Sequence, residues 1–589
     1  MQLIIPYVLA RYAPPVARVM AMCGLLILAA CHDEQALPEE QNNTFSISKD
    51  KVSYVPLETI RFRVDHDMPP NTRIRYKYLG EVIEEVDYRG NTWEWQAPLD
   101  NHKGYMVELY TMHQNREQVL ACMAVDVSTN WNRFPRYGFL SDFSPTADAE
   151  TTINLLTRHH INAILFHGWN RDPYSPYPGM SGHTDQTWQN MTGHEVSLYK
   201  LKEYIALANN RQIKTFYHNM AFAASTGDNS QNIQERWHLF RDPLRQQKDI
   251  FQTQKPPFHH DMYVMNPANL GWQQHISGTN QHITAQFGFD GWHMDQFGDR
   301  GRVYDFGGQI VPLDSDFKPF LDFIKGDNPT TRLIFNAHNQ YGQYAIAHSP
   351  VDILFTEVHP PNDSYSDLGR IILNNHSFSN QAKQTVLAAY MNQGLADRPG
   401  YFNTHSVLLT NAVIFALGAS HLGLGEHMLS SANYFNNNLQ MTYDLQAALV
   451  SYYDFLVAYQ NILRDGGSFN RPAIVVANRA CCVNHWPPQP GNIVLIGKEI
   501  DTRQVIHLIN FFDIESLDWQ DPMGQKPQPE RLQNPVIVHS TNRTVKNIWF
   551  ASPDVNHGSS QTIDFTQDDT NVIFQIPSLT YWSMVVIEY

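Results

Sequence analysis

The chain has few cysteines and no run of basic side chains, and these two shortages exclude whole classes of protein. Its 589 residues include five cysteines. So few thiols in so long a chain exclude the disulfide framework that supports small secreted domains. Lysine and arginine number 42 against 58 aspartates and glutamates, which gives a net charge of −16. Without a basic patch or stripe we expect no nucleic-acid partner.

The sequence also lacks the short motifs of several common chemistries. There is no Gly-x-Ser-x-Gly elbow, no phosphate-binding glycine-rich loop, no His-Glu-x-x-His and no Cys-x-x-Cys pair. Adjacent histidines on a strand point apart, so we expect the pairs His159-His160 and His259-His260 to be loop or surface groups. We therefore predict neither a metal site nor a cofactor.

One apolar run, residues 20–30, lies near the N-terminus and is too short to span a bilayer. It follows two arginines and ends in Leu28-Ala29-Ala30-Cys31, which resembles a bacterial lipoprotein signal with Cys31 as the lipidated residue. The alternative is an ordinary signal peptide with an incidental cysteine. We predict a signal peptide over 1–30 and a polar tether over 31–43. The protein would be an exported lipoprotein, anchored to a membrane, with the outer membrane or cell surface favoured by the acidic residues after Cys31.

The pattern of the remaining chain predicts an α/β protein of three domains. Short alternating runs such as 60–64 and 106–110 predict an immunoglobulin-like β-sandwich over residues 44–128. From 129 to 465, apolar strands alternate with amphipathic helical stretches, which is typical of a (β/α)8 TIM barrel. Residues 466–589 return to short strands between Pro- and Gly-rich turns, and predict a C-terminal antiparallel β-sandwich domain.

The middle region supplies eight candidate strands, the number that a closed barrel needs. They are residues 137–143, 162–169, 213–220, 288–295, 332–338, 352–357, 385–391 and 416–422. The three cysteines of the folded part, Cys122, Cys481 and Cys482, fit no metal site, and we interpret them as buried hydrophobic residues, leaving a bridge among them open.

The segment 288–300 carries the first candidate for chemistry. On a period of two, Gly291, His293 and Asp295 share one strand face, and Trp292 and Met294 share the other. Barrel strands present catalytic side chains at their C-terminal ends, so Asp295 is placed at the functional rim. The alternative is structural, since an aspartate before a turn often caps the next helix or pairs with a nearby arginine.

A second carboxyl group, Glu357, ends the sixth candidate strand and would face the same rim. Two carboxyl groups at one site are what glycoside hydrolysis requires. Asp295, kept ionised, suits attack on the anomeric carbon, and Glu357 suits protonation of the departing oxygen. Glu357 could instead be a structural partner of His359.

Ordered motifs across the chain resemble glycoside hydrolase family 66, the family of endo-dextranases and cycloisomaltooligosaccharide glucanotransferases. The motifs are Tyr137-Gly138-Phe139-Leu140-Ser141-Asp142-Phe143, Tyr217-His218-Asn219-Met220, Met265-Asn266-Pro267, Asp290-Gly291-Trp292-His293-Met294-Asp295-Gln296, Thr356-Glu357-Val358, Tyr365-Ser366-Asp367-Leu368, His421-Leu422-Gly423-Leu424-Gly425-Glu426 and Tyr452-Tyr453-Asp454-Phe455. The resemblance implies a retaining mechanism on α-1,6-linked glucan, with Asp295 as nucleophile and Glu357 as acid/base. It also implies the same order of three domains. The carbohydrate-binding module that cyclising members carry within the barrel is missing here, which favours hydrolysis over cyclisation.

The chain departs from the family at the end of the second strand. Similar enzymes usually carry an aspartate before the tryptophan there, whereas this chain has Gly168 before Trp169. Asp172 lies a few residues on and is a candidate substitute. The loss puts the preferred glucan, the rate and the activity itself in question.

Nine further rim residues are candidates for contact with a glucan substrate, by position and chemistry. We expect Trp169 and Trp292 to stack on sugar rings. We expect hydrogen bonds to hydroxyls from His218, Asn219, His293, Gln296, Tyr390, His421 and Glu426. The alternative for each is that it packs or braces the barrel, most of all for Trp292, whose strand face points toward the helices.

Three hypotheses follow for the function. The first is a lipid-anchored retaining endo-glycosidase that cleaves α-1,6-glucosidic bonds of dextran-like glucans through a covalent intermediate. The second is a transglycosylase of the same family that forms cyclic isomaltooligosaccharides. The third is a glucan-binding surface lipoprotein whose catalysis is weakened by the loss at Gly168.

Overall fold

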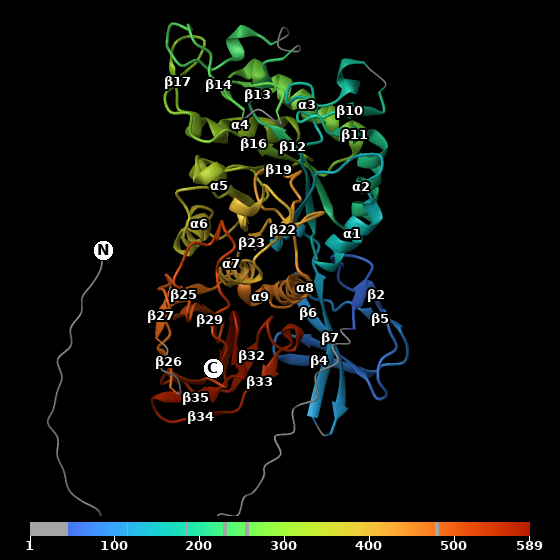
Figure 1. Cartoon of the computed structure of the whole chain (residues 1–589), viewed down its shortest axis with the longest axis vertical. Helices are drawn as coiled ribbons and strands as arrows, with labels where there is room; N and C mark the ends of the chain where they lie inside the picture. Colours follow the sequence, from blue (N-terminus) through green and yellow to red (C-terminus); the bar gives the residue numbers. More distant parts are fainter. Residues whose placement is uncertain (1–44, 115, 183–184, 228–232, 254–257, 478–481) are drawn as a thin grey trace, which may run out of the picture. The chain divides into compact units, whose positions relative to one another are not determined.

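The computed structural model describes residues 45–114, 116–182, 185–227, 233–253, 258–477 and 482–589, and shows a mixed α/β protein with many sheets (Figure 1). The predicted signal peptide and tether, with Cys31, lie outside the described residues, as does Cys481. Among the helices of the described part, none is both long and apolar enough to cross a membrane.

Residues 47–127 form two antiparallel sheets, drawn in blue in Figure 1. One sheet has the order β1-β2-β5 and the other β4-β3-β6-β7. The strands are β1 (Ile47–Lys49), β2 (Thr59–Val64), β3 (Arg73–Tyr78), β4 (Glu81–Asp87), β5 (Thr92–Gln96), β6 (Lys103–His113) and β7 (Arg116–Val127). Apolar side chains of both sheets share one core, which includes Phe62, Tyr76, Trp95 and Val107. The strands predicted at 60–64 and 106–110 are confirmed.

All eight strands predicted in the middle region are present, and those joined by ladders run parallel. Five form a sheet of order β19-β16-β12-β9-β8, and three form a sheet of order β20-β21-β23. Their bounds are β8 (Tyr137–Leu140), β9 (Ala163–Phe166), β12 (Lys214–Met220), β16 (Gly291–Asp295), β19 (Arg332–Phe335), β20 (Leu354–Glu357), β21 (Thr385–Ala388) and β23 (Ser420–His421).

Isolated parallel bridges join the two sheets at both seams. Asn336 just past β19 pairs with Phe355 in β20, and Phe139 in β8 pairs with Gly425, four residues past β23. Side chains on the two faces of the strands belong to different apolar clusters. Phe139, Leu165 and Phe355 lie in the inner one. This arrangement gathers the C-terminal ends of parallel strands at one edge, where the candidate residues stand.

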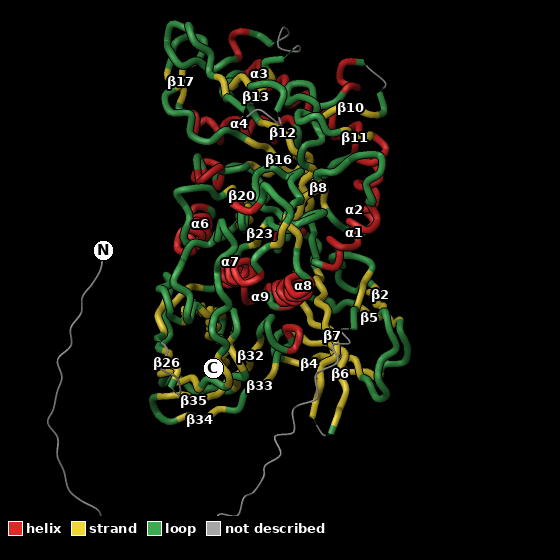
Figure 2. The backbone as a smooth tube through the Cα atoms, viewed as in Figure 1, coloured by secondary structure: helices red, strands yellow, loops and turns green. Residues whose placement is uncertain are grey.

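Helices follow most of these strands and contact one another in chain order from α1 to α8 (Figure 2). They are α1 (Ala149–Arg158), α2 (Leu198–Asn210), α3 (Leu270–Phe287), α4 (Leu313–Asp327), α5 (Gln343–Ala347), α6 (Tyr365–Phe378), α7 (Thr404–Ala416), α8 (Tyr443–Ala458) and the short α9 (Gln460–Leu463). Side-chain caps fix several of their starts: Ser364 and Asp367 form a capping box on α6, and Asn403 caps α7.

Loops between these elements carry small sheets of their own. They pair β10 (Thr187–Gln189) with β11 (Glu195–Ser197), β15 (Met262–Val264) with β13 (Ala223–Ser225) and β14 (Ile250–Phe251), β17 (Val303–Tyr304) with β18 (Ile310–Val311), and β22 (Gly400–Tyr401) with β24 (Leu439–Gln440).

The C-terminal region, orange to red in Figure 1, contains a seven-stranded and a four-stranded sheet around a second apolar core. The larger sheet holds β25 (Ser468–Asn470), β27 (Val483–His485), β28 (Ile493–Ile500), β29 (Arg503–Asn510), β32 (Asn547–Ala551), β33 (Gln561–Thr562) and β37 (Trp582–Glu588). The smaller holds β26 (Ile474–Val476), β31 (Val536–Ser540), β34 (Phe565–Gln567) and β35 (Asn571–Gln575), and β30 (Leu532–Gln533) pairs with β36 (Ser578–Leu579). Strand content is as predicted here.

The cysteine prediction holds at one position and fails at another. Cys122 is buried in β7, and burial raises its pKa well above the usual value. Cys482 is exposed and free, so its assignment as a buried hydrophobic residue was wrong. It lies one residue before β27, outside the second apolar core.

The prediction for the first histidine pair holds only in part: His159 and His160 lie in the turn after α1, as loop residues, but both are buried. The His160 ring lies between two charged side chains. Its Nδ1 is 3.0 Å from Lys49 Nζ, and its Nε2 is 2.7 Å from Asp454 Oδ1. Arg158 also pairs with Asp454. A neutral ring that accepts from the ammonium and donates to the carboxylate satisfies all three groups. His259 and His260 are exposed, as predicted.

Protonation of His160 should weaken the fold in acid. Burial, followed by the charge of Lys49, lowers the pKa of His160 to about 3. This folded-state pKa lies below the unfolded value. The contribution of neutral His160 to the free energy of unfolding is therefore complete above about pH 6.5 and is lost as pH falls toward 3. Between pH 7 and 5 the loss is about 2 kcal/mol.

We expect His160→Gln to remove this share of the pH dependence, since glutamine keeps a donor for Asp454 and does not titrate. Thermal unfolding midpoints of wild type and variant, measured from pH 7 to 5, should converge as pH falls. His348→Gln, at an exposed position, is the control. Parallel curves for wild type and His160→Gln would contradict the assignment.

Candidate active site

Asp295 is the last residue of β16, where the inner strand face meets the rim. Its Oδ1 accepts hydrogen bonds from Asn336 Nδ2 and from the backbone N–H of Gln296, both at 2.8 Å. Its Oδ2 lies 3.3 Å from His218 Nε2. Arg300, one arginine that could have neutralised it, pairs with Asp249 instead. The Asp295 carboxylate therefore stays at the rim, with 26% of its side chain exposed.

Glu357 is the last residue of β20, which the register places beside Ala388 of β21. Its Oε1 accepts a hydrogen bond of 2.7 Å from the Tyr390 hydroxyl and lies 3.0 Å from His359 Nε2. Its Oε2 accepts from Asn336 Nδ2 at 2.9 Å. The alternative that Glu357 is a partner of His359 is thus correct as a contact. The same carboxylate also binds Asn336, which connects it to Asp295.

Asn336 joins the two carboxylates. Its single amide nitrogen donates to Asp295 at 2.8 Å and to Glu357 at 2.9 Å, so the two accepting oxygens are separated by no more than the combined length of these bonds. Its Oδ1 accepts from the Glu357 backbone N–H, and its carbonyl accepts from Gln296 Nε2. With every polar group of Asn336 engaged, the spacing of the two acidic side chains is fixed.

Both carboxylates are held in their ionised forms. Burial would raise the pKa of Asp295, but His218 and Asn336 outweigh it, and the pKa lies below the usual value. Burial likewise acts against ionised Glu357, while His359 and Tyr390 hold its pKa well below the usual value. In return, Glu357 overcomes burial at His359 and raises the pKa of that ring. The pair therefore favours an ionised Glu357 beside a protonated His359.

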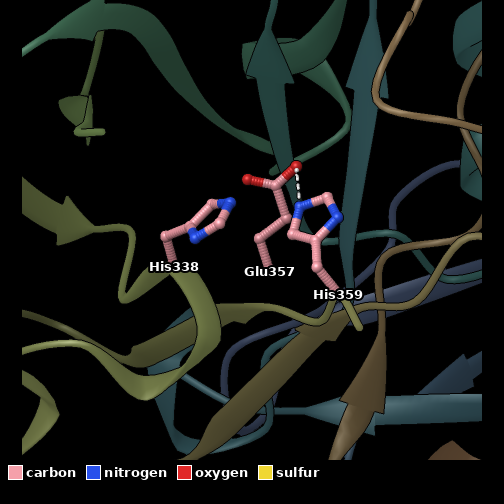
Figure 3. A group of neighbouring side chains, drawn as sticks. All are labelled: His338, Glu357 and His359. Carbon is pink, nitrogen blue, oxygen red and sulfur yellow. Dashed lines mark ion pairs between the residues drawn. The ribbon is translucent and has the colours of Figure 1, made fainter. Parts of the chain in front are cut away.

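Two histidine rings, those of His338 and His359, lie beside the Glu357 carboxylate (Figure 3). His338 and His359 stack with ring centroids 4.6 Å apart, and each turns a ring nitrogen toward the carboxylate. His338 follows β19 within two residues of Asn336.

Two of the nine predicted sugar contacts touch the carboxylates directly. His218, in β12, approaches Asp295, and Tyr390, two residues past β21, donates to Glu357. Tyr390 is in turn hydrogen-bonded to Tyr434, on whose ring His167 stacks at 3.9 Å. The rim around the acidic pair is thus built of tyrosine and histidine.

The prediction that Trp169 and Trp292 stack on sugar does not fit their positions, because both side chains are fully buried. Their indole nitrogens donate to the backbone carbonyls of His218 and Asn219, respectively. Both rings belong to the outer apolar cluster. Trp292 stands on the strand face that meets the helices, whereas Trp169 lies three residues past β9 and contacts Phe287 of α3. For Trp292, this burial agrees with the stated alternative that its strand face points toward the helices and the ring packs the barrel.

Four other predicted contacts are held within the protein. Asn219 donates to Pro173 O, and Gln296 to Asn336 O. Both ring nitrogens of His421 have partners, Asn411 Oδ1 and Ala389 O, each at 2.8 Å. Glu426 accepts from the backbone N–H groups of Ser141 and Asp142. These side chains position the rim.

His293 shares the face of Asp295, as predicted, but it lies in the interior. Its Nδ1 is 3.0 Å from the Tyr137 hydroxyl, and the two rings are stacked. Burial, followed by the nearby His218, lowers its pKa to about 3, so the ring is neutral. His293 supports the site from within the strands.

An aromatic ring occupies the space next to Gly168. The glycine has a left-handed backbone with φ of 67°, and a Cβ added there would lie 2.3 Å from Phe435 Cζ. Phe435 stacks on His194 with ring centroids 4.1 Å apart. Asp172, the candidate substitute, is buried and accepts from the backbone N–H groups of Tyr174 and Ser175, so it caps its own turn.

Gly168→Asp should therefore destabilise the protein, and should not restore the role of the aspartate that similar enzymes carry there. The new side chain meets Phe435, and overpacking of this kind costs about 1–3 kcal/mol beyond the backbone penalty. Gly182→Asp is a matched control, because Gly182 has φ of 79° and no atom of the described residues comes within 4 Å of its Cβ position. Thermal unfolding should show a larger loss for Gly168→Asp, and Phe435→Ala should relieve it in the double variant. Equal losses at both glycines would argue against the clash.

Several residues of the site were not singled out from the sequence. Asn336 and His338 follow the apolar strand at 332–335, and polar residues directly after a strand are the signal that could have found them. Tyr434 and Phe435 lie in a loop without periodicity, and no sequence pattern points to them.

Comparison with known proteins identifies the family. A sequence profile described as Glycosyl hydrolase family 66 matches residues 49–586. The chain belongs to this family. The resemblance drawn from the motifs is confirmed, and the chain is a glycoside hydrolase by descent.

Two relatives show the range of family 66. A Cycloisomaltooligosaccharide glucanotransferase of Niallia circulans is 23% identical, with 84% of this chain and 66% of the relative covered. A Dextranase of Streptococcus salivarius is 21% identical, with 84% of this chain and 68% of the relative covered. This chain thus spans about two thirds of the length of these relatives.

A solved family structure has the same fold. It is a cycloisomaltooligosaccharide glucanotransferase from Paenibacillus sp., complexed with cycloisomaltoheptaose. The TM-score is 0.81 at 22% identity, with 92% of this chain and 99% of that chain covered.

Proposed function

We propose that this protein is a retaining endo-glycoside hydrolase that cleaves α-1,6-glucosidic bonds in dextran-like glucans. The observation that carries the proposal is the Asn336 amide, which donates to Asp295 and Glu357 at once. The limit on the separation of these two oxygens is closer to the spacing of about 5–5.5 Å in retaining enzymes than to the spacing of about 6.5–9.5 Å in inverting ones, which supports a retaining mechanism.

In the first step, Asp295 attacks the anomeric carbon. Its Oδ1 is engaged by two donors at 2.8 Å, whereas Oδ2 receives one longer bond from His218 among the described residues, so Oδ2 keeps the freer lone pair. The bond from C1 to Oδ2 forms as the glycosidic bond breaks, and Glu357 gives its proton to the departing oxygen. For this step the proton that His359 carries must first pass to Glu357.

In the second step, water replaces the cleaved chain. Glu357, now a carboxylate, takes a proton from the water, whose oxygen attacks C1 while the bond to Asp295 breaks. The hydrogen bond from Tyr390 and the contact with His359 stabilise the ionised form of Glu357 in this step. Two displacements leave the α configuration unchanged.

The same proposal extends to architecture and location. The two sheets of parallel strands would act as one closed (β/α)8 barrel, with the domain limits drawn from the sequence at 44–128, 129–465 and 466–589. Export as a lipoprotein anchored through Cys31 would place the enzyme where polymeric glucan is accessible. Labelling with a radioactive fatty acid, lost in Cys31→Ser, tests the anchor.

Cyclisation is the second candidate, favoured by the names of the glucanotransferase relatives. The alignment with the Niallia circulans relative runs over 643 positions, more than the 589 residues of this chain, so it includes segments with no counterpart here. This supports the lack of an inserted module and favours hydrolysis. A glucan-binding role with weak catalysis is the third candidate, supported by Gly168 and the Phe435 ring against it.

Incubation with dextran, pullulan and starch, followed by sizing of the products, separates these functions. Endo-hydrolysis of dextran predicts an early fall in polymer size with new reducing ends, and Asp295→Asn is the inactive control. Cyclisation predicts products without reducing ends. Dextran binding without any product would contradict hydrolysis, and cleavage of starch alone would contradict the α-1,6 assignment.

A further inference from the structure

We propose that His338, Glu357 and His359 form a binding site for a first-row transition-metal ion such as Zn²⁺, and that the bound ion blocks the active site. No metal site was predicted from the sequence, because its adjacent histidine pairs point apart on a strand. These two histidines are 21 positions apart and meet only through the fold (Figure 3). The blocking role rests on the proposed function of Glu357, whereas the binding does not.

The ligand set is of the kind that zinc uses. One carboxylate oxygen and one nitrogen of each ring lie within 4.8 Å of one another. Two histidines and a glutamate, with a fourth position open to water, make up one of the common open zinc sites. A tetrahedral ion 2.0–2.2 Å from its ligands holds them about 3.4 Å apart. Glu357 Oε1 and His359 Nε2 already lie 3.0 Å apart.

The three ligands are positioned by hydrogen bonds outside the set. Asn339, next to His338, has φ of 49° and accepts from the backbone N–H of His359 at 2.8 Å. It also donates to Pro360 O, so one side chain ties the two histidine loops together. Asn336 and Tyr390 orient the Glu357 carboxylate. Outer contacts of this kind hold metal ligands in place before the ion arrives.

Packing and access also suit an ion. The His338 ring is backed by Gly298, where an added Cβ would lie 3.0 Å from Nδ1, and one ring nitrogen points toward Glu357 (Figure 3). The His359 side chain is 27% exposed and that of Glu357 14%. The His359 Nε2 atom is itself buried and, apart from its ion pair with Glu357, has no hydrogen-bond partner within the described residues, so it is left for an ion. With Asp295 and Glu357 both ionised, the local potential attracts a cation.

The expected effect on chemistry follows from the atoms involved. A metal bound to Glu357 takes the lone pair that would accept or carry the transferred proton, and it occupies space beside the oxygen of the scissile bond. Zn²⁺ should therefore inhibit, and a chelator should restore activity. No change in oxidation state is involved.

Binding is best tested without reference to activity. Co²⁺ is titrated into the full chain, purified without a polyhistidine tag, and the visible absorption that develops on coordination by nitrogen and oxygen ligands is recorded. We expect saturation at one ion per chain in wild type and in His348→Gln, and none in His338→Gln or His359→Gln. Unchanged thermal unfolding of the metal-free variants shows that they fold.

The outcomes separate the two proposals. No saturable absorption, or equal titration of the His338 and His359 variants with wild type, overturns the metal site even if dextran is cleaved. Saturable absorption that depends on both histidines supports it, even if the metal-free protein cleaves no glucan and the proposed function fails. If the enzyme is active and Co²⁺ binds as expected, unchanged activity in saturating Zn²⁺ overturns the blocking role.

Discussion

Asp295→Asn should lower kcat on dextran by about four orders of magnitude or more while leaving the fold intact. Asparagine keeps the shape of the side chain, and its oxygen can still accept from Asn336 and from the Gln296 backbone, while its amide faces His218. What is lost is the nucleophilic oxygen. Turnover is measured by release of reducing ends, and thermal unfolding reports the fold.

A small anion distinguishes a lost nucleophile from a disturbed site. In Asp295→Ala, azide should enter the space left by the carboxylate and attack C1 directly, so a substrate with a good leaving group yields glucosyl azide of inverted, β configuration. Asn336→Ala removes the donor shared by both carboxylates but keeps the nucleophile, so azide should not rescue it. Wild-type activity in Asp295→Asn would contradict the role.

Glu357→Gln should lower dextran cleavage by about two to four orders of magnitude, the usual contribution of general acid–base catalysis. The loss should depend on the leaving group. An α-glucosyl fluoride needs little proton assistance, so its first step should stay close to the wild-type rate, and the second step, which needs the base, should become slow. Burst kinetics of fluoride release check this.

Azide also tests this residue, with the opposite stereochemistry. In Glu357→Ala, azide needs no base and should attack the glycosyl-enzyme, which restores turnover and gives α-glucosyl azide. His348→Gln is the control for a remote histidine change. Equal losses on dextran and on the fluoride would contradict the acid/base role, as would β-glucosyl azide.

Much of the architecture was accessible from the sequence because strand and helix periods are local properties. All eight strands of the middle region were located, with bounds that ran a few residues too long, because the loops after β8 and β21 contain further apolar residues such as Phe143 and Met391. The sheet orders, the seams at Asn336 and Gly425, and the burial of His160 depend on contacts between distant segments, which periodicity does not report.

The acidic pair was predicted correctly in its placement at one rim, because both residues end apolar strands. Trp169 and Trp292 were expected at the substrate because of their chemistry, but both rings are buried in the outer apolar cluster. The strand face of Trp292 directs its ring there, and Trp169, in the loop after β9, packs against Phe287 of α3. The Phe435 ring against Gly168 lies more than 260 positions away in the chain. A missing side chain can be noticed in a sequence, but what fills its place cannot.

Mass spectrometry of a trapped intermediate tests whether Asp295 is the nucleophile. Glu357→Gln is mixed with an α-glucosyl or α-isomaltosyl fluoride, quenched in acid and digested. If Asp295 is the nucleophile, we expect a glycosylated peptide whose sugar is esterified to Asp295. Fluoride release without any adduct, or an adduct on another carboxyl group, would contradict it.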